Sequence, residues 1–189
     1  MLKKVGVHIL SEQFSVSDEL YNAFCLGAEG DDFEEWDEEA LSAALGYVSE
    51  GTENGTDFPA DEPQDDGTIE IFTEGSLRSA DGAVTLTYHE TDVENDVTLK
   101  TVLRFYENEP QAVNMVRFGE VNASFFFEPH KRTKCVYNMP FGAMELTVRT
   151  LRVDNRLVED GVLSLDYIIE IRGADAEHKR VTITAKPIQ

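Results

Sequence analysis

Cysteine and histidine side chains are the first candidates for catalysis or metal binding in this chain. The four histidines, His8, His89, His130 and His178, are scattered without a paired spacing, so they give no metal-ligand signal. Cys135 and His130 could form a nucleophile and its base, but no third group orients the base and no oxyanion donor is recognisable. The sequence therefore predicts no catalytic residue, no metal site and no cofactor, and it favours a protein that is not an enzyme.

Arg117 and Asn122 are the polar residues whose placement most suggests a binding site. Arg117 lies between Met115 and Gly119, where a predicted strand ends. A cation at the end of a barrel could hold the carboxylate of a ligand. In the alternative interpretation, Arg117 packs across the barrel end and pairs with an internal acid, while Asn122 serves a turn. Ion-pair networks of that kind often imitate sites, and strand alternation does not decide whether Arg117 points inward.

The elements that would position these side chains are β-strands, because apolar and polar residues alternate with a period of two from Thr68 onward. One alternating set is Val84, Leu86 and Tyr88, and another is Leu163, Leu165, Tyr167, Ile169 and Ile171. Turn signals such as Asp81-Gly82 separate the strands. A change of parity predicts a β-bulge near Arg149-Thr150. The pattern predicts a mainly β protein, a closed up-and-down antiparallel barrel of about 8–10 strands.

The domain organisation follows from where the strands and the charges lie. We expect residues 1–189 to form a single barrel domain, with its first strand at 3–10, the remaining strands at 68–186 and an acidic insertion at 11–67. The insertion holds 18 of the 37 acidic residues and no Lys or Arg. Apolar residues at helical spacing predict a helix around 32–48. Turn and breaker residues predict a mobile loop at 51–67.

Composition and charge exclude several kinds of partner and location. A formal net charge of −21 repels nucleic acid and anionic membranes, so we expect neither as a partner. The apolar stretch at the N-terminus is too short for a signal peptide and is broken by His8, and no later run is long enough to span a bilayer. Cys25 and Cys135 have no metal or redox spacing. Two reduced thiols in a cytoplasmic protein are the expectation.

Several segments together carry a family resemblance. The most specific are Arg-x-Gly-x-x-Asn at 117–122 and Pro-Phe-Gly at 140–142, and they are accompanied by Val148-Arg149-Thr150 and by the ending at 179–184. With the first strand and residues 68–186, they resemble the YwiB-like family of small bacterial proteins, also described as domain of unknown function 1934. The resemblance implies a calycin-like (lipocalin-like) β-barrel with no established activity. The insertion at 11–67 departs from the usual short form of that family.

The matching segments also contain the candidate ligand-binding residues. These are Arg117, Asn122, Tyr137, Phe141 and Arg149. We expect the turn at 140–142 to plug the barrel end rather than to bind a ligand, because Pro fixes φ and Gly permits positive φ. Lipocalins carry Gly-x-Trp near the first strand, and this chain has no Trp there. The resemblance therefore supports the barrel and not lipocalin activity.

Two functional hypotheses remain. In the first, the barrel binds a small molecule, which a cation such as Arg117 would allow to be anionic, and has no catalytic activity. In the second, the chain is a protein–protein interaction module that acts through the acidic helical insertion, with Phe33 and Trp36 as contact residues. An open barrel with convergent polar groups would favour the first hypothesis, and a filled barrel with an exposed apolar patch would favour the second.

Overall fold

The computed structural model describes residues 1–16, 65–92, 97–171 and 176–188. Within these residues the chain is entirely built of strands and turns, with no helix. The predicted helix around 32–48, the part of the predicted loop at 51–64, and the candidate contact residues Phe33 and Trp36 lie outside the described residues.

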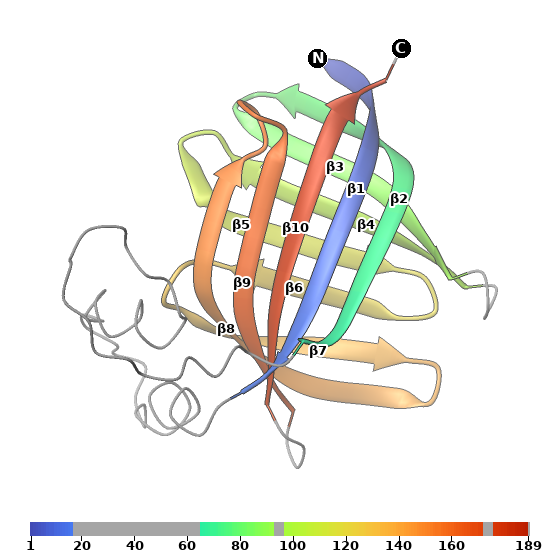
Figure 1. Ribbon diagram of the computed structural model, residues 1–189, viewed down its shortest axis with the longest axis vertical. Coiled ribbons are helices and arrows are strands. Elements are labelled where there is room, and N and C mark those ends of the chain that lie inside the picture. Colours follow the sequence, from blue (N-terminus) through green and yellow to red (C-terminus); the bar gives the residue numbers. More distant parts are fainter. Residues whose placement is uncertain (17–64, 93–96, 172–175, 189) are drawn as a thin grey trace.

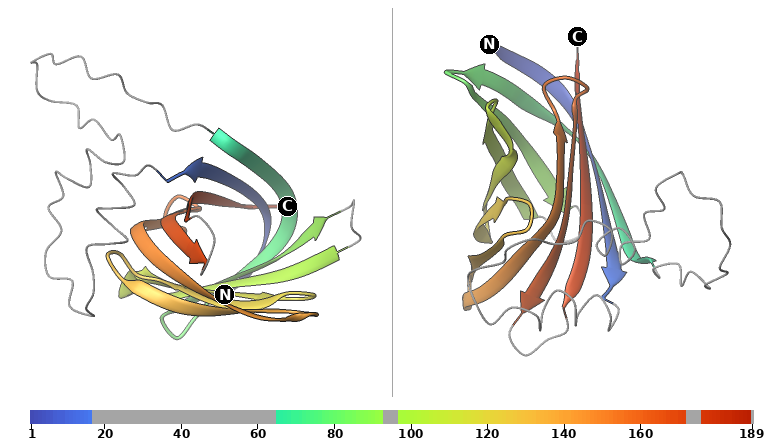
Figure 2. Two further views of the ribbon diagram at one scale, coloured as in Figure 1. Left: turned by 90° about the horizontal axis from the view of Figure 1, so that it is seen from below. Right: turned by 90° about the vertical axis from the view of Figure 1, so that its left-hand side faces the viewer.

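Ten strands form one closed antiparallel barrel, in which each strand pairs with its neighbour in sequence and β10 pairs with β1 (Figure 1). The strands are β1 (Leu2–Ser15), β2 (Asp65–Ala80), β3 (Ala83–Asp92), β4 (Val97–Tyr106), β5 (Glu109–Phe118), β6 (Asn122–Phe127), β7 (Arg132–Met139), β8 (Gly142–Arg156), β9 (Val162–Ile171) and β10 (Glu177–Pro187). Seen from below in Figure 2, they curve round into a continuous wall. The mainly β class and the closed up-and-down barrel predicted from the alternation are confirmed.

The bounds of the insertion are corrected by the pairing of β1 with β2. The ladder continues from Leu2↔Arg78 to Phe14↔Asp65, and residues 11–15 of β1 also pair with β10. Residues 11–15 and 65–67 are therefore strand rather than insertion or loop. The polar run Ser11-Glu12-Gln13 concealed this, because hydrogen bonds to a strand on each side outweigh a weak local preference.

Because β1 and β2 are antiparallel neighbours up to Phe14↔Asp65, a short turn can replace the chain between them. We expect a variant in which Asn-Gly replaces residues 17–64 to keep a cooperative unfolding transition, since loop length costs little closure entropy. Urea unfolding followed by circular dichroism measures this. A variant without a cooperative transition would contradict the single-barrel organisation.

Local turn chemistry behaves as the sequence indicates. Asp81 and Gly82, in the turn between β2 and β3, have φ of 53° and 73°, as a two-residue hairpin turn with both central residues left-handed requires. The register of β8 against β9 shifts between Thr150 and Arg152, which confirms the predicted bulge. Its effect is to return Val153 to the core side that Val148 also occupies.

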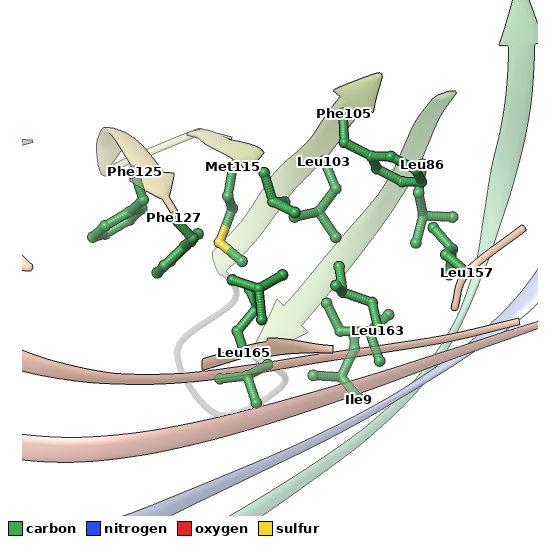
Figure 3. Packing of buried hydrophobic residues seen from close by; sticks show 14 of the residues in the cluster. Ile9, Leu86, Leu103, Phe105, Met115, Phe125, Phe127, Leu157, Leu163 and Leu165 are labelled. Atoms are coloured by element: carbon green, nitrogen blue, oxygen red, sulfur yellow. The ribbon is translucent and has the colours of Figure 1, made fainter. Parts of the chain in front are cut away.

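The barrel interior contains one apolar cluster, drawn from the inward positions of the strands. Figure 3 shows this packing from Phe125 and Phe127 on one side to Leu157 on the other. Leu157 belongs to the turn between β8 and β9, yet it is fully buried. Asn155 fixes this turn through two hydrogen bonds. Its Oδ1 accepts a hydrogen bond from the Leu157 amide (3.2 Å), and its Nδ2 donates one to the Pro110 carbonyl (2.7 Å). Leu157 thus closes the barrel near the β8–β9 turn.

Candidate functional site

A connected group of polar side chains lies inside the barrel on the neighbouring strands β3, β4 and β5. Register aligns Tyr88 with Thr101 and Thr101 with Arg117, and Glu90 follows Tyr88 on the same face of β3. The hydroxyl of Thr101 donates to Glu90 Oε1 over 2.6 Å, and the hydroxyls of Tyr88 and Thr101 are hydrogen bonded to each other. Arg117 Nη2 lies 3.6 Å from Glu90 Oε2. We call these four residues the polar cluster.

Arg117 is the cation of the polar cluster, and it is mostly withdrawn from water. Its side chain is 29% exposed and that of Glu90 is 14% exposed. Burial lowers the pKa of Arg117, but the negative charge of Glu90 and the nearby tyrosines outweigh it and raise that pKa above its ordinary value. The Nε atom of Arg117 is buried and has no hydrogen-bond partner in the described part of the chain. A buried N–H group without a hydrogen-bond acceptor lowers the stability of the fold, because its desolvation is not compensated.

Aromatic rings stand beside the polar cluster on β6, β7 and β9. The ring centroids of Phe125 and Phe127 lie 6.1 Å apart, and Figure 3 shows the two side chains next to each other. Phe125 contacts Tyr137 edge-on at 6.4 Å, and Phe127 contacts Tyr167 at 4.9 Å. Tyr137 and Tyr167 both interact electrostatically with Arg117. The cation therefore faces an aromatic wall.

Burial keeps the hydroxyls of Tyr88 and Tyr167 protonated. It raises the pKa of Tyr167 to about 12, with Arg117 opposing the shift and Glu90 adding to it. Burial and the charge of Glu90 also raise the pKa of Tyr88 above its ordinary value. A hydroxyl that stays neutral remains available as a hydrogen-bond donor.

The raised tyrosine pKa values predict a loss of stability in alkali. Because the pKa of Tyr167 is about 12 in the folded chain against an ordinary 10.0, its contribution is complete below pH 10 and disappears as pH rises through 12. We expect Tyr167→Phe to flatten the fall in the free energy of unfolding over this window, as measured by urea unfolding at several pH values. The exposed Tyr106 provides the control, because Tyr106→Phe should leave the pH dependence unchanged. An unchanged profile for Tyr167→Phe would contradict this assignment.

Two of the five candidate ligand residues meet in this part of the barrel. Arg117 is aligned with Ala123 and Ala123 with Tyr137, so Arg117 and Tyr137 line the same end of the interior. Arg117 also has the ion pair with an internal acid that the alternative interpretation required. Asn122 is exposed and its Nδ2 donates to the Gly119 carbonyl over 3.2 Å, which is the turn role of that interpretation.

The other two candidates lie elsewhere. Phe141 is 92% exposed in the turn between β7 and β8, so the expectation that this turn plugs the barrel end is wrong. The hairpin extends past the end of the core, and Leu157 lies at the opposite end of the barrel, near the β8–β9 turn. Arg149 is buried on the outer side of β8, with Nε 3.9 Å from Glu170 Oε1. Among the residues that sequence reasoning missed are Tyr88, Glu90, Thr101 and Tyr167.

Groups weighed for catalysis do not assemble. Cys135 is buried in the core, where burial raises the pKa of its thiol, whereas His130 is exposed in the turn between β6 and β7. His178 has a close partner that its sequence position did not indicate, because its Nε2 lies 2.5 Å from Asp166 Oδ1 on the outer side of the barrel. No group of three His, Cys, Asp or Glu side chains within the described ranges is placed to hold a metal ion.

The fold and the polar cluster define a closed ten-stranded antiparallel barrel with charged and hydroxyl groups at one end of an apolar core. Residues 58–183 match the sequence profile of the family described as Domain of unknown function (DUF1934), and the chain belongs to that family. The resemblance seen in the sequence is thereby confirmed.

A solved structure and a negative search complete the comparison. The barrel is similar to the crystal structure of the ywiB protein from Bacillus subtilis, with a TM-score of 0.62, 20% identity, and coverage of 100% of this chain and 94% of that one. At this identity the likeness shows the fold alone. No curated protein matches the chain. The family and the structural neighbour indicate no catalytic function. In the part of the chain that is described, no helix is long and apolar enough to cross a membrane.

Proposed function

We propose that the polar cluster binds a small molecule through an anionic oxygen group, such as a carboxylate, and that the protein holds this ligand without transforming it. The observation that supports the proposal is the Nε of Arg117, which is buried beside the aromatic wall without an acceptor among the described residues. A carboxylate would supply the missing acceptor, and guanidinium–carboxylate pairing is among the stronger hydrogen-bonded contacts in proteins.

The partner that Arg117 already has leaves room for this role. Glu90 uses Oε1 to accept from Thr101, and its Oε2 approaches Arg117 only to 3.6 Å, beyond a good hydrogen bond. Glu90 thus keeps the guanidinium charged and oriented without satisfying its Nε. Solvent reaches the Arg117 side chain, whereas the region of the β8–β9 turn is closed by Leu157. The meander order of the strands further supports a calycin-like relationship, in which a barrel end serves as a binding site.

Benzoate and benzamide test the proposal, because they share a planar ring and differ in charge. We expect benzoate to raise the melting temperature of the full chain in a concentration-dependent way and benzamide to have little effect. In Arg117→Lys, which keeps the positive charge but loses Nε, the benzoate shift should be lost. An equal shift with benzamide, or an undiminished benzoate shift in Arg117→Lys, would contradict recognition of an anion by Arg117.

A further inference from the structure

The outer surface of β3 to β7 differs from the rest of the barrel in charge. Among the described side chains of these five adjacent strands, one acid stands at an outward position, Glu109 at the beginning of β5 opposite Tyr106. The whole chain has 37 acidic residues. Acids do stand at outward positions on other strands, among them Glu70 and Glu74 on β2, Glu145 on β8 and Glu170 on β9. The barrel architecture therefore does not exclude acids from its outer surface. We call the outward surface of β3 to β7 the acid-poor face; in Figure 1, β4, β5 and β6 lie behind β1 and β10.

Basic residues are present on the acid-poor face. Lys100 and Arg104 are exposed on β4, and the Arg104 guanidinium lies 5.4 Å above the ring of Tyr106. On β7, at the edge of the face, Lys134 pairs with Glu145 over 3.2 Å and Arg132 pairs with Glu170. The face is thus positive in a protein whose overall charge is −21.

Large apolar side chains are exposed among these bases. Their exposed fractions are 48% for Tyr106, 47% for Phe118, 38% for Phe126 and 50% for Val136. Register places Phe118 directly beside Lys100, and Val102, Val116 and Ser124 form the next row across β4, β5 and β6. A contiguous apolar patch ringed by polar residues is the usual character of a protein interaction surface.

We propose that the acid-poor face docks an acidic segment of a partner protein, one that carries apolar side chains between its acids. Lys100 and Arg104 would meet the acids, and Phe118, Phe126 and Val136 would meet the apolar side chains. The rows from Lys100 to Arg104 carry no acid on β4, β5 and β6, and Glu109 lies beyond them opposite Tyr106. This lowers the repulsion that such a segment would otherwise meet, which favours an acidic partner. Five strands spaced about 4.8 Å apart span about 19 Å, enough for roughly six extended residues.

Single-stranded nucleic acid is the competing occupant, because aromatic rings and basic side chains on a sheet can also bind it. Two observations weigh against it. The whole chain carries −21 charges, which would oppose the approach of a phosphate backbone. Of the four basic residues of the face, Lys134 is already paired with Glu145 and Arg132 with Glu170. An acidic peptide brings fewer charges and has apolar side chains for the patch.

The test measures the fluorescence anisotropy of a labelled peptide in which Glu alternates with Phe, titrated with the full chain. We expect binding, and we expect Lys100→Glu/Arg104→Glu to weaken it by about tenfold or more, as loss of charged contacts at an interface does. Phe118→Ser should weaken it to a similar degree. These side chains point outward and are exposed, so the variants should keep the urea midpoint of the wild type.

Matched controls come from the outer face of β1 and β2. Lys4→Glu reverses an exposed charge and Phe72→Ser removes an exposed ring, and each should leave peptide binding within about twofold of wild type. Absence of peptide binding would overturn the proposal, and so would an equal effect of Lys4→Glu, which would reduce the contact to net charge. Tighter binding of a labelled oligothymidylate than of the peptide would assign the face to nucleic acid instead.

Discussion

Replacing Arg117 with alanine is expected to lower the free energy of unfolding by about 3 kcal/mol. Removing one partner of a buried pair costs about 3–5 kcal/mol because the other charge stays buried and uncompensated. The lower end applies here, since Glu90 keeps its hydrogen bond from Thr101 and is 14% exposed. Urea unfolding of wild type and variant measures the difference. Arg78→Ala is the control, because Arg78 is exposed and its loss should cost less than about 0.5 kcal/mol.

A second variant separates the ion pair from the space that Arg117 fills. Arg117→Met combined with Glu90→Leu removes both charges and keeps much of the volume, so it should recover most of the stability lost in Arg117→Ala. If Arg117→Ala is instead as stable as wild type, Glu90 does not depend on the arginine. Arg117 would then be a cation retained at no benefit to folding, which is typical of residues kept for binding.

The fold could be predicted because its signals are local. Alternation with a period of two marks the strands, Asp81-Gly82 marks a hairpin, and the parity change near Thr150 marks the bulge. Strand limits were less accessible. Residues 11–15 are held in β1 by hydrogen-bonded pairing with β2 and β10. The local sequence Ser11-Glu12-Gln13 does not predict this pairing, because both partner strands are distant in the chain.

The site was predicted only in part, because its partners depend on register. Arg117 stood out as a cation at a strand end. Thr101 lies opposite it because of the β4–β5 register, and this register shifts between Arg104 and Tyr106. Glu90 shares the parity of Val84, Leu86 and Tyr88, so its inward direction was readable from the alternation. The sequence does not show that the Glu90 carboxylate lies close to the Arg117 guanidinium. Leu157 was missed for a similar reason, since a leucine in a turn gives no sign that the turn folds back into the core.

The turn between β8 and β9, which carries Leu157, sets up the second large effect. Gly161 has φ of 74°, and a Cβ placed on it would lie 2.5 Å from the carbonyl oxygen of Ala185. That neighbour cannot move aside easily, because the Ala185 amide donates to the Gly161 carbonyl over 2.7 Å and holds the two backbones together. We expect Gly161→Ala to cost about 1–2 kcal/mol for the left-handed backbone and about 1–3 kcal/mol more for the steric overlap.

Gly82 supplies the matched control, because it has nearly the same φ, 73°, and open space where its Cβ would stand. Gly82→Ala should therefore show the backbone cost alone, about 1–2 kcal/mol, and the difference between the two variants measures the overlap with Ala185. Urea unfolding of both variants gives this difference directly. Equal destabilisation would mean that the Ala185 strand yields to the added methyl group, and that the β8–β9 turn is not held tightly against β10.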